Sequence, residues 1–382
     1  MHNFKLSLTD LPHDIFHNLI FPTLSINDIA AVMMTCKAAF RIVERYDGHG
    51  SIERCQIITS ISRMHRQTAA LIIKFPRLLL NLYILQRREL TTDMCINKFA
   101  NNLLKLTCSG QCAETLTQPA PYLQKLTIRN HAPNLNRVLD KCCGNSSYFA
   151  LPALTHLTLD KIIYNGVISI YNTETLKYLY INFVETPSPI YINNLPNLTD
   201  LYISTQVDEH PDIYDITNNN IGETISIIDA PNISFLSIRN YVVKFDITQL
   251  TNLGKIILNC VNYIPGNSSC ELFQIDFNEA FPILTSLSIT DSASVSSPGA
   301  WPPQNSTLCD LSNLDELHLT YISQLVQIGN LSNIKHVDID KCYELVSIES
   351  ASYIEFMTIT SCCDLNNEFR RHCVDHLKIE GL

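Results

Sequence analysis

A short pattern of apolar residues recurs along most of this chain and constrains its fold more than any other feature. The frame reads apolar-x-x-apolar-x-apolar, and Pro-x-Leu or Asn-Leu usually introduces it. Successive frames start 20 to 24 residues apart, except at four longer intervals of 30 to 35 residues that are rich in Gly, Pro, Asn and Ser. The thirteen starts are residues 79, 103, 123, 154, 176, 198, 233, 253, 284, 314, 334, 354 and 374. Such a period predicts a solenoid in which each repeat is one small structural unit.

Each frame predicts one short strand. Side chains of a strand alternate between two faces, so positions 4 and 6 should face the core while positions 3, 5 and 7 face solvent. The pattern and its period are typical of leucine-rich repeats. The predicted fold class is therefore α/β: a small N-terminal helical domain, then a leucine-rich-repeat solenoid with parallel strands on its concave face. Units of 20 residues leave little room for full helices, so we expect short helical, extended or irregular segments on the convex side and inserted loops in the long intervals.

Composition excludes several classes of protein. The chain of 382 residues is 46% hydrophobic and 17% charged, which fits a core-forming protein and neither a disordered chain nor a coiled coil. Its net charge of -10 argues against a nucleic-acid partner, because phosphate binding needs clustered Lys and Arg. We see neither an apolar run long enough to span a membrane nor a secretory signal. The expected location is therefore cytoplasmic, nuclear or both, with the fourteen cysteines reduced and no membrane partner.

No motif for catalysis, metal binding or cofactor binding is found, so we predict that the chain is not an enzyme and needs no cofactor. Phosphate-binding Gly loops, nucleophile elbows and His-Glu-x-x-His helices are all missing from the sequence. Two sets of residues could suggest chemistry but have a simpler interpretation. We interpret the cysteines as core residues and the His-carboxylate stretches as solvated faces of strands: Cys108, Cys112, Cys142-Cys143 and Cys362-Cys363; Asp315 to His318 and His336 to Asp340.

The stretch LPHDIFHNLIFPTLSINDIAAVMMTCKAAF, from Leu11 to Phe40, is different in kind. Thr9 or Asp10 can cap a first helix, Pro22 ends it, and a second apolar period of three and four follows. This stretch resembles the F-box, whose usual line is Leu-Pro-x-Glu-Ile, a spaced Ile and Leu, Asp-Leu, Val and Cys-Lys or Cys-Arg before an aromatic residue. Asp14 stands for the commoner Glu, Phe40 for the frequent Trp, and the spacing is about one residue longer near Pro22.

The resemblance implies the architecture and role of F-box and leucine-rich-repeat proteins, which are substrate receptors of cullin-RING ubiquitin ligases. It divides the chain into an F-box domain (1–48), a helical linker or N-terminal cap (49–75) and a solenoid of about 13 repeats (76–382). It also implies that the F-box binds a Skp-family adaptor and, through it, a cullin scaffold. Seven residues match family positions that build either the adaptor interface or its supporting core: Leu11, Pro12, Ile15, Ile20, Leu24, Ile29 and Val32. The alternative is a non-ligase repeat scaffold or binding protein whose N-terminal helices only cap the solenoid.

Outward positions of three consecutive frames predict where a target protein binds. They carry several aromatic residues and one Arg, the residue types most enriched among those that dominate binding energy. The predicted target-binding residues, which lie near Asp200, are Tyr178, Tyr180, Tyr202, Phe235 and Arg239. Aromatic residues also stabilise sheets by packing across strands, and that interpretation stays open. Trp301, in one of the long loops, is the next candidate.

Overall fold

The chain folds into two compact units, Met1–His156 and Leu157–Leu382. The computed structural model describes residues 57–60, 80–84, 96–132, 134–142, 151–164, 166–184, 189–205, 225–239, 250–259, 279, 281–290, 306–322, 325–350, 353–362, 365 and 374–380. The F-box-like stretch and Trp301 lie outside these residues, so the structure does not test what the sequence predicts for them. None of the helices in the described ranges is long and apolar enough to cross a membrane.

The first unit combines short parallel strands with small helices. Its strands follow the order β1-β2-β3-β4. Strand β1 lies in the stretch predicted as a helical linker or cap; its β-branched residues Ile57, Ile58 and Thr59 pair with β2 instead. The elements are β1 (Ile57–Ser60), β2 (Leu80–Ile84), the 3₁₀ helix η6 (Ile96–Asn102), β3 (Leu103–Ser109), α5 (Gly110–Glu114), β4 (Lys125–His131) and α6 (Leu135–Cys142).

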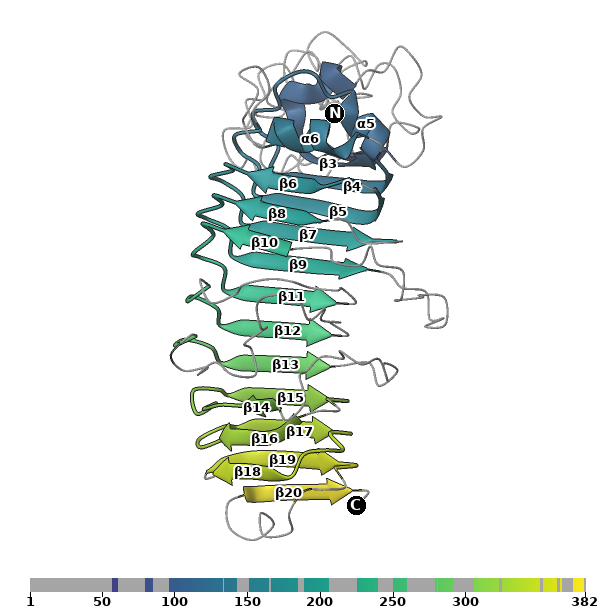
Figure 1. The fold of residues 1–382 in the computed structure, drawn as a ribbon. Coiled ribbons are helices and arrows are strands. Elements are labelled where there is room, and N and C mark those ends of the chain that lie inside the picture. The colour runs from purple at the N-terminus through teal and green to yellow at the C-terminus, as the bar shows by residue number, and fades with distance from the viewer. Residues whose placement is uncertain are drawn as a thin grey trace, which may run out of the picture. The chain divides into compact units, whose positions relative to one another are not determined.

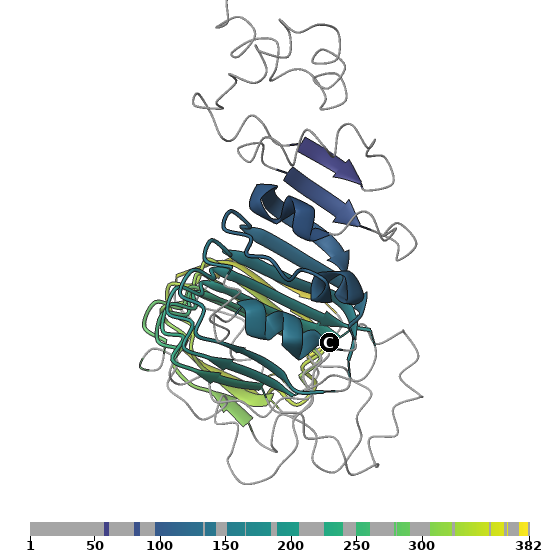
Figure 2. The same cartoon turned by 90° about the horizontal axis from the view of Figure 1, so that it is seen from above.

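The second unit is built on one parallel sheet, to which each frame of this unit contributes one strand (Figure 1). Seen along the stack, these strands lie one behind another (Figure 2). The predicted strands are confirmed at all thirteen frames of the chain. In sheet order they are β5 (His156–Ile163), β7 (Tyr178–Phe183), β9 (Asp200–Thr205), β11 (Phe235–Arg239), β12 (Lys255–Asn259), β13 (Ser286–Thr290), β15 (Glu316–Thr320), β17 (His336–Asp340), β19 (Ile354–Thr360) and β20 (Val374–Glu380).

A continuous apolar column fills the coil behind this sheet. Positions 4 and 6 are buried in every frame whose side chains the structure describes, as the period-2 pattern predicts: Leu179 and Ile181 on β7 have no exposed surface, and the same holds for Leu236 and Ile238 on β11. Position 1 is buried as well, for example at Leu198. Burial of one such side chain contributes about 1.5 to 3 kcal/mol. Most of the stability therefore comes from contacts between repeats, because no single repeat could cover its own apolar residues.

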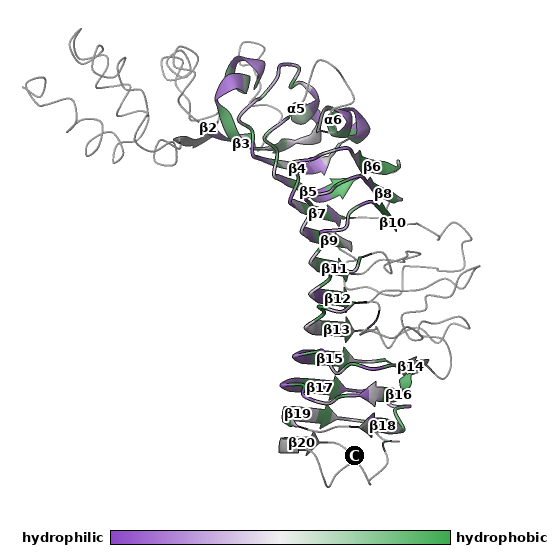
Figure 3. Ribbon diagram, turned by 90° about the vertical axis from the view of Figure 1, so that its left-hand side faces the viewer, coloured by the Kyte–Doolittle hydropathy of each residue, from purple (hydrophilic) through white to green (hydrophobic). Residues whose placement is uncertain are grey.

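In the segments of the second unit that the structure describes, the opposite side of the coil is extended. Short strands there pair into two three-stranded parallel sheets, β10-β8-β6 and β14-β16-β18. The second of these lies across the coil from β15, β17 and β19 (Figure 3). Of the options expected for these segments, the extended one is confirmed where the structure describes them, because they pair with one another as parallel strands. The strands are β6 (Ile168–Tyr171), β8 (Ile190–Asn193), β10 (Ile225–Ile228), β14 (Ser306–Leu308), β16 (Leu325–Asn330) and β18 (Ser347–Ser350).

A turn before each strand explains the Pro-x-Leu and Asn-Leu signature. In the LPNL turn the amide of Leu198 donates to the carbonyl of Leu195 at 3.1 Å, so Pro196 occupies the turn position that suits its fixed φ. The Asn that follows Pro links neighbouring repeats: Asn232 Nδ2 donates to the carbonyl of Pro196 at 2.6 Å. Equivalent bonds run from Asn197 to Glu174 and from Asn252 to Pro231.

The carbonyl at position 2 holds the next repeat in register in most frames of the second unit. The carbonyl of Lys177 accepts the amides of Thr199 and Asp200 at 2.9 and 3.1 Å, and the same pattern repeats through the sheet as far as Asp315. A hydroxyl often adds a third bond: Thr199 Oγ1 donates to the carbonyl of Lys177 at 3.0 Å, and Ser234 Oγ to that of Thr199 at 3.3 Å. This row of hydroxyls is interrupted at Gly254, which occupies position 2 of its own frame.

Replacing Gly254 by Thr should raise the free energy of unfolding by about 0.5 to 1 kcal/mol, because the unfolded chain loses freedom and the carbonyl of Ser234 gains a hydroxyl donor. The site has room, since an added Cβ would lie 3.6 Å from the carbonyl oxygen of Ser234. Thermal unfolding followed by circular dichroism measures the effect. A lower melting temperature for Gly254→Thr would contradict the role given to this row of hydroxyls.

Gly329 provides the matched control. An added Cβ there would lie 3.0 Å from the amide nitrogen of Asp310 and from the carbonyl oxygen of Leu308, both backbone atoms of the neighbouring repeat. Gly329→Ala should therefore lower stability by about 1 kcal/mol or more. Opposite signs at the two glycines would show that the effect depends on the contacts between repeats and not on glycine itself.

Candidate binding face

The register of the main sheet arranges the outward residues of the second unit in three rows. Strands pair residue for residue, so equal positions of successive frames lie side by side about 4.8 Å apart. From β7 to β19, row 3 contains Tyr178, Asp200, Phe235, Lys255, Ser286, Glu316, His336 and Phe356; row 5 contains Tyr180, Tyr202, Ser237, Ile257, Ser288, His318, Asp338 and Thr358; row 7 contains Asn182, Ser204, Arg239, Asn259, Thr290, Thr320, Asp340 and Thr360.

The four predicted aromatic residues lie in mutual contact, and we call Tyr178, Tyr180, Tyr202 and Phe235 the aromatic cluster. Tyr202 is its centre: the centroid of its ring lies 4.7 Å from that of Phe235 in a stacked arrangement. It also lies 5.2 Å from the ring of Tyr178 and 6.2 Å from that of Tyr180, both tilted. All four side chains are partly exposed, so the cluster presents ring surface and hydroxyl groups to solvent. This arrangement allows both packing across strands and contact with another molecule.

Two charged residues flank the cluster. Asp200 lies in row 3 between Tyr178 and Phe235, and one of its oxygens lies 2.7 Å from the hydroxyl of Thr199, whose single proton it shares with the carbonyl of Lys177. Arg239, the fifth predicted residue, is exposed in row 7 at the other end of β11. Arg239 is thus on the same face as the cluster but at a different level along the strands.

These charges act on the phenols of the cluster. Burial, the neighbouring Tyr202 and Tyr180, and the carboxylate of Asp200 raise the pKa of Tyr178 above its ordinary value. Burial and Asp200 also raise the pKa of Tyr202, while the guanidinium of Arg239 acts in the opposite direction. The two phenols therefore stay protonated at neutral pH and can donate hydrogen bonds.

Three outward positions differ from the period-2 expectation because they are buried. Asn182 in row 7 is only 3% exposed, as is Ser237 in row 5, and Ser286 in row 3 is 7% exposed. Neighbouring polar groups satisfy Asn182: its Nδ2 donates to Asp160 Oδ1 at 3.4 Å, and its Oδ1 accepts from Ser204 Oγ at 3.1 Å. The Glu316 carboxylate accepts from Ser286 Oγ at 3.1 Å. All three side chains are short, and each lies on a strand that has a neighbour on both sides in the sheet.

The His-carboxylate residues lie on the exposed face, as the sequence indicates. His318 Nδ1 is 3.8 Å from Asp338 Oδ2, and both side chains are about half exposed. His336 stacks on Phe356 with ring centroids 5.2 Å apart. Water screens so exposed a pair, which limits the interaction to a surface ion pair of low energy.

The cysteines predicted as core residues are confirmed where their side chains are described. Cys108, Cys112 and Cys362 are buried and form no disulfide. Hydrogen bonding to Cys112 and burial raise the pKa of the Cys108 thiol well above its usual range. In the parts of the chain that the structure describes, no group of three or more His, Cys, Asp or Glu side chains could hold a metal ion. The side chains of Cys142, Cys143 and Cys363 are outside those parts.

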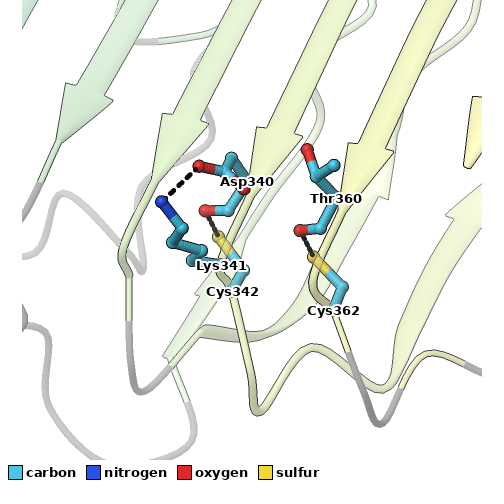
Figure 4. Close-up of polar contacts among 5 residues, drawn as sticks. All are labelled: Asp340, Lys341, Cys342, Thr360 and Cys362. Atoms are coloured by element: carbon cyan, nitrogen blue, oxygen red, sulfur yellow. Dashed lines mark hydrogen bonds and ion pairs between the residues drawn. The ribbon is translucent and has the colours of Figure 1, made fainter. Parts of the chain in front are cut away.

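Sequence reasoning missed a group of contacts just after strands β17 and β19 (Figure 4). Cys342 and Cys362 occupy position 9 of successive frames, and their thiols lie toward the carbonyls of Asp340 and Thr360 at 3.7 and 3.4 Å. At position 8, Lys341 Nζ lies 3.3 Å from Asp340 Oδ2 and 4.3 Å from the ring centroid of Tyr321. The sequence did contain a signal for the two cysteines: they are 20 residues apart, at position 9 of successive frames, where Asn or Cys is typical of a leucine-rich repeat.

Comparison with known proteins identifies no family for this chain. No family model matches the sequence, and no curated protein matches it. Solved structures with similarity include the "Crystal structure of TLR13-ssRNA13 complex", at 12% identity and a TM-score of 0.33, with 87% of this chain and 52% of that chain covered. The chain thus spans about half the length of that structure. Its description as a leucine-rich-repeat-like solenoid rests on its own period and register.

Replacing Asp200 by Asn should lower the pKa of Tyr178 and of Tyr202, because a nearby carboxylate disfavours the phenolate and the amide does not. NMR titration of assigned ring signals in protein with ¹³C-labelled Tyr measures both values. The control is Asp315→Asn, which changes an exposed carboxylate just before β15. It should leave the pKa values of both tyrosines unchanged. Unaltered values in Asp200→Asn would mean that Asp200 does not act on the cluster.

Proposed function

We propose that the chain is a protein-binding repeat protein that holds a target on the outward face of its second unit. The single observation that carries this proposal is the aromatic cluster, because Tyr202 brings three other rings together on a face that is open to solvent. Exposed Tyr and Phe next to an Arg are the groups that contribute most to binding between proteins. A rigid repeat surface also loses little entropy when it binds.

The N-terminal stretch gives this binding protein a more specific role in the proposal. The F-box-like residues of 1–48 bind a Skp-family adaptor, which links the chain to a cullin scaffold, and the repeats carry the target to be ubiquitylated. The chain itself is then a non-enzymatic receptor without a cofactor, located in the cytoplasm, the nucleus or both, with no nucleic-acid or membrane partner. What supports this role is the order of Leu11-Pro12, Ile15, Asp28-Ile29 and Cys36-Lys37 in the sequence.

A second candidate function is a repeat scaffold without a ligase role. It keeps the target-binding face and treats the N-terminal helices as a cap on the solenoid, which terminal repeats need. The fold favours both candidates equally, so adaptor binding decides between them.

Changing Ile15 and Leu24 together to Asp should abolish copurification with a Skp-family adaptor, since an unpaired charge in an apolar interface costs several kcal/mol. Pulldown of the tagged full-length chain with the adaptor measures this. The same chain should keep the circular dichroism of its strands. Undiminished adaptor binding, or no binding by the unaltered chain, would remove the ligase role and leave the scaffold.

Changing Tyr180, Tyr202 and Phe235 to Ala should weaken target capture by roughly 2 kcal/mol or more and leave adaptor binding unchanged. The control is Tyr191→Ala on β8, which removes an exposed Tyr from the other side of the coil. Quantitative affinity purification compares the proteins retained by the two variants. If both retain the same proteins, the target site lies elsewhere and Trp301 becomes the next residue to test.

A further inference from the structure

The charges around the aromatic cluster indicate what kind of target segment fits it. Asp200 lies between two rings of row 3, and in the described part of the chain no cation forms an ion pair with its carboxylate. Arg239 is exposed in row 7, and among the described residues no carboxylate pairs with it. The face therefore offers one negative group, Asp200, and one positive group, Arg239. The rings of the aromatic cluster lie next to Asp200.

The chain itself contains an example of a carboxylate and a Tyr ring that bind a cation together. Lys341 Nζ lies 4.3 Å from the centroid of the Tyr321 ring and 3.3 Å from Asp340 Oδ2. An ammonium is thus held between the face of a Tyr and a carboxylate that come from adjacent repeats. Asp200 with Tyr178 and Tyr202 offers the same two groups, and here the chain supplies no cation of its own in the described ranges.

We propose that the cluster binds an extended segment of the target that carries an Arg or Lys near one end and an Asp or Glu about four residues away. This proposal rests on the target-binding function proposed above and adds the chemistry of the partner. The basic side chain lies over the rings of Tyr178 and Tyr202 and pairs with Asp200, within the roughly 6 Å over which a ring attracts a cation. The acidic side chain pairs with Arg239, where a planar guanidinium can bind both carboxylate oxygens.

The spacing follows from the geometry of the sheet. Row 3 and row 7 are four residues apart along a strand, and a strand rises about 3.3 Å per residue, so Asp200 and Arg239 lie at levels about 13 Å apart. An extended peptide covers that distance in four residues. A segment of this kind matches both charges only in one orientation, which fixes the direction in which the target crosses the cluster.

Other occupants fit these observations less well. A nucleic acid could stack its bases on the rings, but its phosphates would meet Asp200 on a chain with a net charge of -10. A second copy of the chain would bring the same face and the same flanking charges, and nothing in the described residues aligns Asp200 of one copy with Arg239 of another. Both occupants remain as outcomes of the test.

Short random peptides displayed on phage are the probe, selected on the full-length chain and counter-selected on its Tyr202→Ala variant. Selected peptides are synthesised with a fluorescent label and titrated against the unaltered chain and the variants Asp200→Asn, Arg239→Gln and Tyr191→Ala. We expect enrichment of a basic and an acidic residue about four positions apart. Affinity should fall about tenfold or more in Asp200→Asn and in Arg239→Gln, and should be unchanged in the control Tyr191→Ala.

Changes in the peptide then test each contact. Replacing its Arg by citrulline should cost about tenfold against the unaltered chain and little against Asp200→Asn, because that variant has already lost the same pair. Peptides that depend on Tyr202 but lack a basic residue, or are insensitive to Asp200→Asn, would overturn this inference and leave the target-binding function intact. If no peptide depends on Tyr202, or if single-stranded oligonucleotides or self-association depend on it instead, both proposals are wrong.

Discussion

One backbone carbonyl per repeat, that of position 2, holds the next repeat in place from Lys177 to Asp315, and the binding face of the second unit depends on it. It accepts two amides and often a hydroxyl from the following frame, as at Lys177, Thr199 and Thr285. Because the same bond recurs from Lys177 to Asp315, the frames joined by it start their strands at the same level, which fixes the register. A slip of one residue would turn all apolar side chains of a strand to solvent. The register therefore protects the core and also fixes which outward residues become neighbours.

That constraint explains how distant residues form one surface. Tyr178 and Tyr202 are 24 positions apart in the chain, and Phe235 is another 33 positions further on, yet their rings are in contact. A long insertion between β9 and β11 does not disturb this, since the carbonyl of Thr199 still receives the amides of Ser234 and Phe235. Loops can thus vary in length at small cost in loop entropy while the face between them keeps its geometry.

Much of the fold could be predicted because the frame encodes it directly. The alternation at Leu179 and Ile181 gives strand and inward face, and the spacing of frames gives the parallel stack. The aromatic cluster could be predicted for the same reason, since its members share frame positions. The burial of Asn182 and Ser237 could not, because the frame assigns them to solvent and only the side chains on adjacent strands cover them. The strand β1 could not be predicted from the pattern either, because a run of only four residues fits a strand or a helix equally well. Pairing with β2 is what makes this segment a strand.

By itself, the sequence determined the repeat, its period, the buried positions and the F-box-like stretch at the start, because each depends on residue type at fixed spacing. The tertiary structure alone decided what lies opposite the main sheet in the second unit, where segments such as ISIY and IYIN became strands by pairing with their equivalents in adjacent repeats. It also decided the contact of Lys341 with the ring of Tyr321 and the ring contacts of Tyr202 with Tyr178 and Phe235. These contacts join residues of different repeats, and their geometry exists only once the carbonyl bonds have set neighbouring strands about 4.8 Å apart.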